Sequence, residues 1–337
     1  MRNKLVFILF LFGFLQKNAA QQRPHYTQYI LNNYILNPAL SGIENYTDLK
    51  LSARDQWVGF AGKPQTFYLS VHAPIGKKDY KTSATSFDVP GENPRGTSYW
   101  QNYTASAPHH GAGFSIVNDI TGNYNVFTAD VSYAYHLGLS PTLNLAAGFS
   151  GGISKVNYNR SKATPAVIGD PGINSSGNVI YKTRPDLNAG LWLYSGDYFV
   201  GLSAQQIIPQ KVAFVNDSLG LTLTPHLFGT AGYRFLLNEQ VNAVPSVMVK
   251  APAGAPAQVD VNIKFQYLDL LWLGGGYRFG NGFAGMLGLN VGNTFNVGYS
   301  YDYSTNLVGR DSRGTHEIVI GFLLGNRYDD SCPRNVW

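Results

Sequence analysis

Segments that alternate between polar and apolar side chains recur along this chain from residue 47 to residue 325. The clearest is 258–267, where every second side chain is apolar and the others are polar or charged. This two-residue period is typical of a β-strand with chemically opposite faces, and a tilted strand of about ten residues spans a membrane. The alternation, together with the lack of any unbroken apolar stretch of 18 residues, predicts an all-β, transmembrane antiparallel β-barrel.

About fourteen segments carry this pattern, and we expect each to be one strand of the barrel. They are 47–60, 65–75, 111–120, 124–137, 142–154, 186–195, 197–206, 223–237, 242–250, 256–267, 269–280, 282–292, 293–303 and 314–325. An even count places both ends of the barrel on the periplasmic side, with short turns there and long loops outside. The connection 76–110 breaks this rule. Either it is a periplasmic insertion or a strand before it is miscounted.

The composition agrees with a barrel and excludes some functions. Charged residues make up only 13% of the chain, about half the usual share for a soluble domain. The formal charge of +5 includes Arg2, Lys4 and Lys17, so the chain from residue 21 onward has 22 basic and 20 acidic residues, a net charge of +2. We therefore expect no nucleic-acid partner. The single cysteine, Cys332, rules out an internal disulfide.

The N-terminus has the features of a secretory signal. A basic start precedes the apolar run 5–15, and small residues follow at Ala19 and Ala20. We therefore expect cleavage near Ala20 and a location in the bacterial outer membrane. The expected organisation is a signal peptide at 1–20, an N-terminal segment at 21–46, a β-barrel at 47–325 and a C-terminal tail at 326–337.

The polar face of the strands carries charges of both signs, which indicates ion pairs across the lumen and not an ion-selective ring. A barrel of about fourteen strands is too wide for its own side chains to fill, so we expect a plugged or occupied lumen. The candidates are the segment 21–46 and the long loops. Apolar residues from 30 to 36 favour a short helix in this segment, ending at Asn37-Pro38 because a residue before proline avoids helical geometry.

Several blocks of the chain resemble the PorP/SprF family of Bacteroidetes outer-membrane proteins, which is associated with the type IX secretion system. The matching blocks are Thr27-Gln28-Tyr29, Asn37-Pro38-Ala39, 54–60, 70–75, 116–119 and 315–318. Two features depart from the family pattern. The connection 76–110 is longer than the family's usual turn, and the chain continues past the last strand to Trp337.

The resemblance implies an outer-membrane barrel that binds partner proteins and helps secrete or surface-attach large, adhesin-type substrates. The implied partners are membrane lipid, a secreted substrate with a C-terminal sorting domain, and other type IX secretion components. The alternative is an outer-membrane channel for a small solute. No catalytic constellation survives the strand geometry, so we expect a non-enzyme without a cofactor or metal. Adjacent residues of a strand point opposite ways, which makes His109-His110 a poor metal site.

Five residues stand out as candidates for contact with a partner or with a plug. They are Tyr29, Asn37, Pro38, Arg54 and Trp57. For Arg54 and Trp57 the sequence also allows a purely structural role, with the arginine ion-paired in the lumen and the tryptophan at the membrane interface.

Overall fold

A computed structural model describes residues 26–77, 105–159, 179–215, 219–238, 240–268, 270–291, 294–306 and 312–326. The expected signal peptide, most of the connection 76–110 and residues 327–337 of the expected tail lie outside these ranges. Among the residues just named, no helix combines the length and apolar character needed to cross a membrane.

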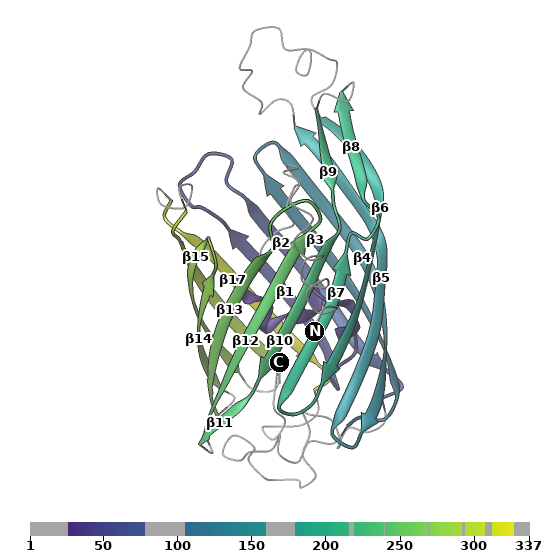
Figure 1. The fold of residues 1–337 in the computed structure, drawn as a ribbon, viewed down its shortest axis with the longest axis vertical. Helices are drawn as coiled ribbons and strands as arrows, with labels where there is room; N and C mark the ends of the chain where they lie inside the picture. The colour runs from purple at the N-terminus through teal and green to yellow at the C-terminus, as the bar shows by residue number, and fades with distance from the viewer. Residues whose placement is uncertain are drawn as a thin grey trace, which may run out of the picture.

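Within the described residues, fourteen antiparallel strands form one closed barrel, which confirms the predicted fold class (Figure 1). The strands are β1 (Thr47–Asp55), β2 (Gln65–Ile75), β3 (His109–Thr121), β4 (Tyr124–Ser140), β5 (Leu143–Asn159), β6 (Val179–Tyr194), β7 (Tyr198–Gln205), β10 (His226–Tyr233) with β11 (Phe235–Asn238), β12 (Val241–Pro252), β13 (Gln258–Tyr267), β14 (Leu271–Arg278), β15 (Gly282–Val291), β16 (Phe295–Ser304) and β17 (Thr315–Leu324). Strand β1 pairs with both β2 and β17, so the sheet closes on itself.

Strands β10 and β11 together form one wall strand, because both pair with β12. The break between them is at Arg234, whose N–H donates instead to the carbonyl of Asp197 at 2.7 Å. Pro245 of β12 lies at this break and has no N–H to offer a neighbouring strand. The ladder is therefore interrupted where proline cannot contribute to it. A separate two-stranded sheet, β8 (Gln210–Val215) with β9 (Leu219–Leu223), stands beyond the wall.

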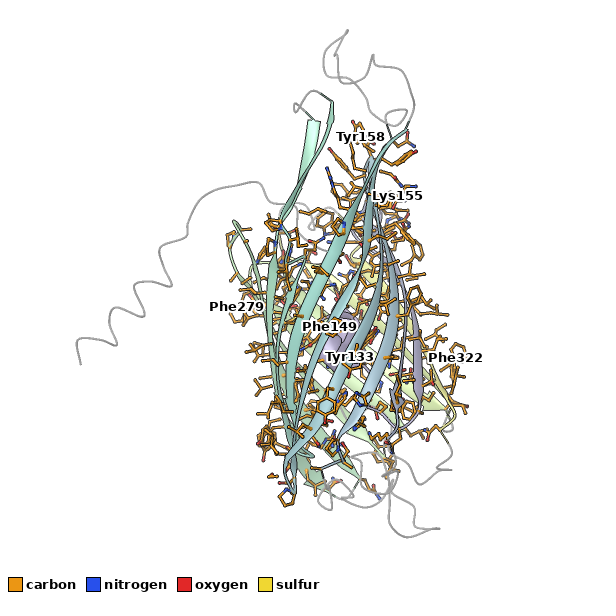
Figure 2. All side chains as sticks on the ribbon, turned by 90° about the vertical axis from the view of Figure 1, so that its right-hand side faces the viewer. Tyr133, Phe149, Lys155, Tyr158, Phe279 and Phe322 are labelled. Atoms are coloured by element: carbon orange, nitrogen blue, oxygen red, sulfur yellow. The ribbon has the colours of Figure 1, made fainter. Side chains whose placement is uncertain are left out.

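The two faces of the wall differ as the alternation predicts. In β13, Asp260, Asn262 and Lys264 are buried inside the barrel, while Val261 and Ile263 are exposed on the outer surface. Figure 2 labels three of the exposed outward rings, Tyr133, Phe149 and Phe322. An outward charge at mid-bilayer would cost about 2–4 kcal/mol, which explains the apolar outer face.

Each expected segment overlaps a wall strand, with one informative difference at its boundary. The segment 47–60 ends as a strand at Asp55, because Trp57 adopts a left-handed backbone conformation with φ of 54°. The connection between β2 and β3 leaves the barrel at the end where the short turns lie. Two strands precede it as expected, so a miscount there is ruled out.

The N-terminal segment, defined here as residues 26–46, lies inside the barrel (purple in Figure 1). The expected short helix over 30–36 is present as short 3₁₀ helices that end before Asn37. The structure has three 3₁₀ turns, η1 (Thr27–Leu31), η2 (Asn33–Ile35) and η3 (Pro38–Leu40). Asn32 and Asn37 separate them, because both have extended φ angles near −145° that no α-helix accommodates.

Candidate functional site: the lumen and the N-terminal segment

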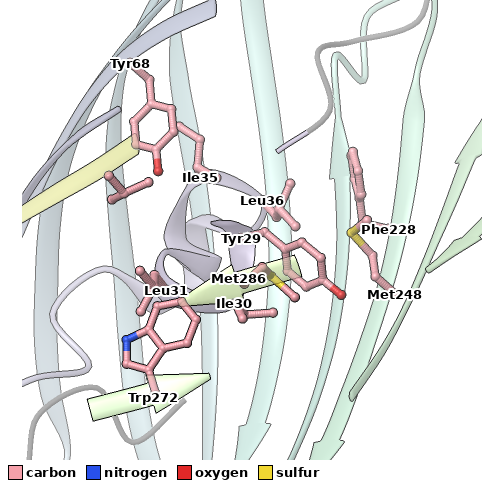
Figure 3. Close-up of a cluster of buried hydrophobic side chains, with 11 residues drawn as sticks. Tyr29, Ile30, Leu31, Ile35, Leu36, Tyr68, Phe228, Met248, Trp272 and Met286 are labelled. Carbon is pink, nitrogen blue, oxygen red and sulfur yellow. The ribbon is translucent and has the colours of Figure 1, made fainter. Parts of the chain in front are cut away.

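Two apolar clusters attach the N-terminal segment to an otherwise polar lumen. In the first, shown in Figure 3, side chains of η1 and η2 pack against inward residues of six wall strands. Its segment members are Tyr29, Ile30, Leu31, Ile35 and Leu36, and its wall members are Tyr68, Phe228, Met248, Trp272, Met286 and Val319. In the second, Tyr34, Ala39 and Leu40 pack against Trp192 and Phe199, whose rings stack at 4.8 Å.

Two glycines of the wall lie where the backbone of residues 39–41 passes close to β3 and β5. A Cβ added to Gly111 would lie 1.8 Å from the carbonyl oxygen of Ser41, and one added to Gly148 would lie 2.6 Å from the Cα of Ala39. These distances are far below van der Waals contact, so no larger residue fits at either position. The wall strands β3 and β5 therefore form a seat for the backbone of residues 39–41. The sequence does not predict these contacts, because a glycine that lies against the segment cannot be distinguished in the sequence from any other glycine of a strand.

Asn37 and Pro38 fit the turn to this seat. The Oδ1 of Asn37 accepts a hydrogen bond from the N–H of Ala39 at 3.0 Å and so caps η3. Its Nδ2 donates to the carbonyls of Leu191 at 3.0 Å and Leu202 at 3.2 Å, which belong to β6 and β7. Pro38 occupies the first position of η3, where its fixed φ favours the turn. One side chain thus joins the turn to two strands.

Arg54 is the centre of a buried ionic network at the start of the segment. Its guanidinium donates to Glu317 at 2.8 Å and to Asp302 at 2.7 Å, and also to the hydroxyl of Thr27 at 2.9 Å. The hydroxyl of Thr27 donates in turn to Asp302 at 2.7 Å, and its backbone N–H donates to Glu317 at 2.8 Å. Arg278 adds a second positive charge, 2.9 Å from Asp260 and 3.7 Å from Asp302. The network joins β1, β16 and β17 to η1.

Three histidines hold the other end of the segment. The Nδ1 of His72 accepts a hydrogen bond from the N–H of Gly42 at 3.3 Å, and His136 donates through Nε2 to the carbonyl of Ser41 at 2.8 Å. The Nε2 of His109 lies 3.2 Å from the carbonyl oxygen of Gly42 and its Nδ1 lies 2.9 Å from that of Ala107, and its ring stacks on His136 with ring centroids 4.5 Å apart. His110 instead points outward, toward the hydroxyl of Tyr133 at 2.6 Å.

Polar groups that a catalytic site would need are hydrogen-bonded to the N-terminal segment. The hydroxyl of Ser132, which shares a strand face with Asp130 and His136, bonds to the hydroxyls of Tyr34 at 2.7 Å and Ser41 at 2.8 Å. Over the described ranges, no three His, Cys, Asp or Glu side chains are placed to hold a metal ion.

Four of the five candidate residues lie in the lumen, and the fifth lies outside it. Tyr29, Asn37, Pro38 and Arg54 are all in the lumen, and Tyr29 accepts a hydrogen bond through its hydroxyl from Asn262 of β13. Trp57 lies beyond the outer end of β1, where its backbone N–H donates to the hydroxyl of Thr315 at 3.2 Å. A role for any of them in partner contact stays a prediction.

Burial changes the acidity of groups in and beside the segment. It raises the pKa of Tyr34 to about 12, so this hydroxyl stays protonated and can donate. Burial also raises the pKa of Glu44 to about 7; Lys77 opposes this shift and Asp48 adds to it. Lys77 itself donates to the carbonyl of Ile43 at 2.8 Å. A carboxyl group that titrates near neutral pH therefore lies where the segment joins β1.

A family model described as "Type IX secretion system membrane protein PorP/SprF" matches residues 18–322. The chain belongs to this family. The family and the barrel together place this PorP/SprF protein in the bacterial outer membrane, as predicted from the sequence. No curated protein sequence matches the chain.

Several solved structures of outer-membrane proteins are similar to this chain at low sequence identity. The Acinetobacter baumannii protein Omp33 is 9% identical with a TM-score of 0.47, and the match covers 84% of this chain and 100% of that one. The Ralstonia pickettii toluene transporter TbuX is 10% identical with a TM-score of 0.45, covering 87% and 92%. The translocator domain of the Neisseria meningitidis autotransporter NalP is 12% identical with a TM-score of 0.37, covering 83% and 88%.

Removing the charge at Arg54 should destabilise the folded barrel strongly. Arg54→Met leaves Asp302 and Glu317 buried without their main partner, and breaking such a pair costs about 3–5 kcal/mol. The matched control is Lys63→Met, because Lys63 pairs with Asp55 at a half-exposed site where the cost is about 0–1 kcal/mol. Denaturant unfolding in detergent micelles, followed by tryptophan fluorescence, measures both. Equal midpoints for the two variants would contradict the importance of the network.

The raised pKa of Glu44 should make stability depend on pH. An unfolded glutamate titrates near pH 4.3, so the folded state binds this proton more tightly than the unfolded state does. That contribution to stability is complete at low pH and is lost as the pH rises through about 7. The unfolding free energy of the wild type should therefore decrease relative to that of Glu44→Gln between pH 5 and pH 8. A difference in unfolding free energy that does not change with pH would contradict the raised pKa of Glu44.

Proposed function

We propose that this PorP/SprF barrel is a plugged, non-enzymatic protein that binds partners in type IX secretion. In this proposal it helps to secrete large adhesin-type substrates, or attach them to the cell surface, through their C-terminal sorting domain. Family membership supports a role within the secretion system. The observation that argues against a free channel is the occupied lumen, since every residue from Thr27 to Gly42 is buried.

The contacts of the N-terminal segment support a firm plug. Its backbone rests on wall glycines at Gly111 and Gly148, its first turn bonds to the Arg54 network, and its last turn bonds to three histidines. A hatch that opens for each solute molecule would have to break all of these contacts together. A permanent plug leaves the outer rim and loops, and not the lumen, as the surface for partners.

Planar-bilayer recordings separate a plugged barrel from a solute channel. The wild-type protein should show little steady conductance. Gly111→Ala should increase it, because its Cβ overlaps the carbonyl of Ser41 and forces the last turn off the wall. Gly285→Ala is the matched control, since nothing lies within 4 Å of the position its Cβ would take. Large steady conductance from the wild type would instead favour the alternative, a channel for a small solute.

Partner binding is tested directly by isolation from the source cells. The tagged full-length protein, crosslinked in the outer membrane and extracted in a gentle detergent, should bring with it a secreted protein with a C-terminal sorting domain or other secretion-system components. Mass spectrometry identifies them, and an unrelated tagged barrel from the same membrane is the control. Recovery of the barrel alone in repeated crosslinking experiments would overturn the proposal.

A further inference from the structure

Strand β5 has an outward lysine at the end of a long apolar run. Its outward residues from Leu143 to Ile153 are leucine, alanine, phenylalanine, glycine and isoleucine, and none of them has a polar side chain. Strand residues that rise about 3.3 Å each and tilt by about 40° cover about 25 Å of height over this range, which equals the apolar band of a membrane barrel. The next outward residue is Lys155. It therefore lies where the hydrocarbon ends and the lipid head groups begin, toward the outer end of the barrel (Figure 2).

Lys155 differs in orientation from the other basic residues of the wall. Its neighbours Ser154 and Val156 are buried in the lumen, so its own side chain points outward. Within the described part of the wall, the other lysines and arginines lie on the inner face: Lys50, Arg54, Lys182, Arg184, Arg234, Lys250, Lys264 and Arg278. An outward lysine costs about 2–4 kcal/mol at the middle of a bilayer and close to nothing at its surface. Its position at the edge of the apolar band is therefore the one that an outward cation can occupy.

Side chains with hydrogen-bond donors surround Lys155 on the outer face. Thr183 of β6 lies directly opposite Lys155, and Asn157 is the next outward residue of β5. Tyr181 lies opposite Asn157, and its ring centre is 4.6 Å from the ammonium of Lys155. This cation–π contact holds the ammonium beside Thr183 and Asn157 and leaves its N–H groups available to an oxygen acceptor.

The cation has no anion of its own in the described ranges. No acidic side chain pairs with Lys155 there, whereas Lys63, the lysine next to the outer end of β1, pairs with Asp55. A lysine at the head-group level of the outer leaflet meets negatively charged lipid head groups. The charge on this face is therefore complementary to the lipid that surrounds it.

We propose that the phosphate head group of an outer-leaflet lipid binds to Lys155, Asn157 and Thr183. A phosphate is negatively charged and its oxygens accept hydrogen bonds, so it complements an ammonium, an amide and a hydroxyl. Nearer the middle of the wall, the outward side chains of Ile153 and Leu187 are exposed and contact the acyl chains of the same lipid, which a free phosphate ion lacks. The inference does not rest on the proposed function, because a lipid on the outer face is compatible with a partner-binding barrel and with a channel.

Native mass spectrometry of the full-length protein in detergent tests the site with defined lipids. The probes are dioleoyl phosphatidic acid, which has a phosphate head group, and dioleoylglycerol, which has the same acyl chains and no phosphate. The wild type should retain the phosphatidic acid about tenfold better, because hydrogen bonds to a charged head group add to the chain contacts. This comparison needs no variant, and equal retention of the two lipids would overturn the inference.

Substitutions at Lys155 locate the site. Lys155→Met should reduce retention of phosphatidic acid about tenfold, and Lys155→Arg should preserve it because the charge remains. Lys182→Met is the matched control, since Lys182 lies opposite Val156 at nearly the same level of the wall but on the inner face, and it should match the wild type.

Three results would overturn the inference in different ways. Retention by Lys155→Met equal to that of the wild type would remove Lys155 from the site. Equal losses in Lys155→Met and Lys182→Met would show only a general attraction between the lipid and the positive charges of the protein. An excess of inorganic phosphate should leave the lipid bound, and full displacement by it would identify a site for a free ion instead of a lipid.

Discussion

The need to pair every backbone polar group that faces lipid controls this structure. A sheet in a membrane has no water to satisfy an open edge, so it must close, and β1 closes it by pairing with both β2 and β17. Closure with fourteen strands leaves an interior wider than inward side chains can fill. The N-terminal segment is the part of the chain that occupies this interior. Strand number and lumen occupancy are therefore linked consequences of one constraint.

The occupied interior explains features of the wall that closure alone does not. A backbone seated against a strand needs glycine where it touches, and Gly111 and Gly148 supply this at the last turn. Buried carboxylates need a buried cation, and Arg54 supplies it to Asp302 and Glu317 while also bonding the first turn. The wall residues that hold the segment come from strands on opposite sides of the barrel. Segment and wall thus share their apolar clusters and their hydrogen bonds.

Most of the fold, but only part of the candidate site, could be predicted from the sequence. Alternation such as that of 258–267 identified the strands, because lipid outside and polar groups inside impose opposite chemistry on adjacent residues. The end of β1 at Asp55 was missed, since the left-handed turn at Trp57 involves a residue type that rarely adopts it. The apolar pattern of residues 30–36 predicts a short helix, and the structure has 3₁₀ helices there, interrupted at Asn32 by its extended φ angle. The contact of Gly111 and Gly148 with the N-terminal segment could not be predicted from the sequence, because it depends on the absence of a side chain and not on the chemistry of one.

Strand β6 links the N-terminal segment in the lumen to the chain that follows β7. Low on this strand, Asn37 bonds to the carbonyl of Leu191, and its Oδ1 lies 2.0 Å from the position that a Cβ at Gly190 would occupy. Higher up, the side chain of Asn188 accepts a hydrogen bond from the N–H of Gln206, and the carbonyl of Leu187 accepts one from the N–H of Ile207. The strand that holds the turn at Asn37 therefore also holds the chain that leads from β7 into β8, so the N-terminal segment and the start of the outer hairpin share one support.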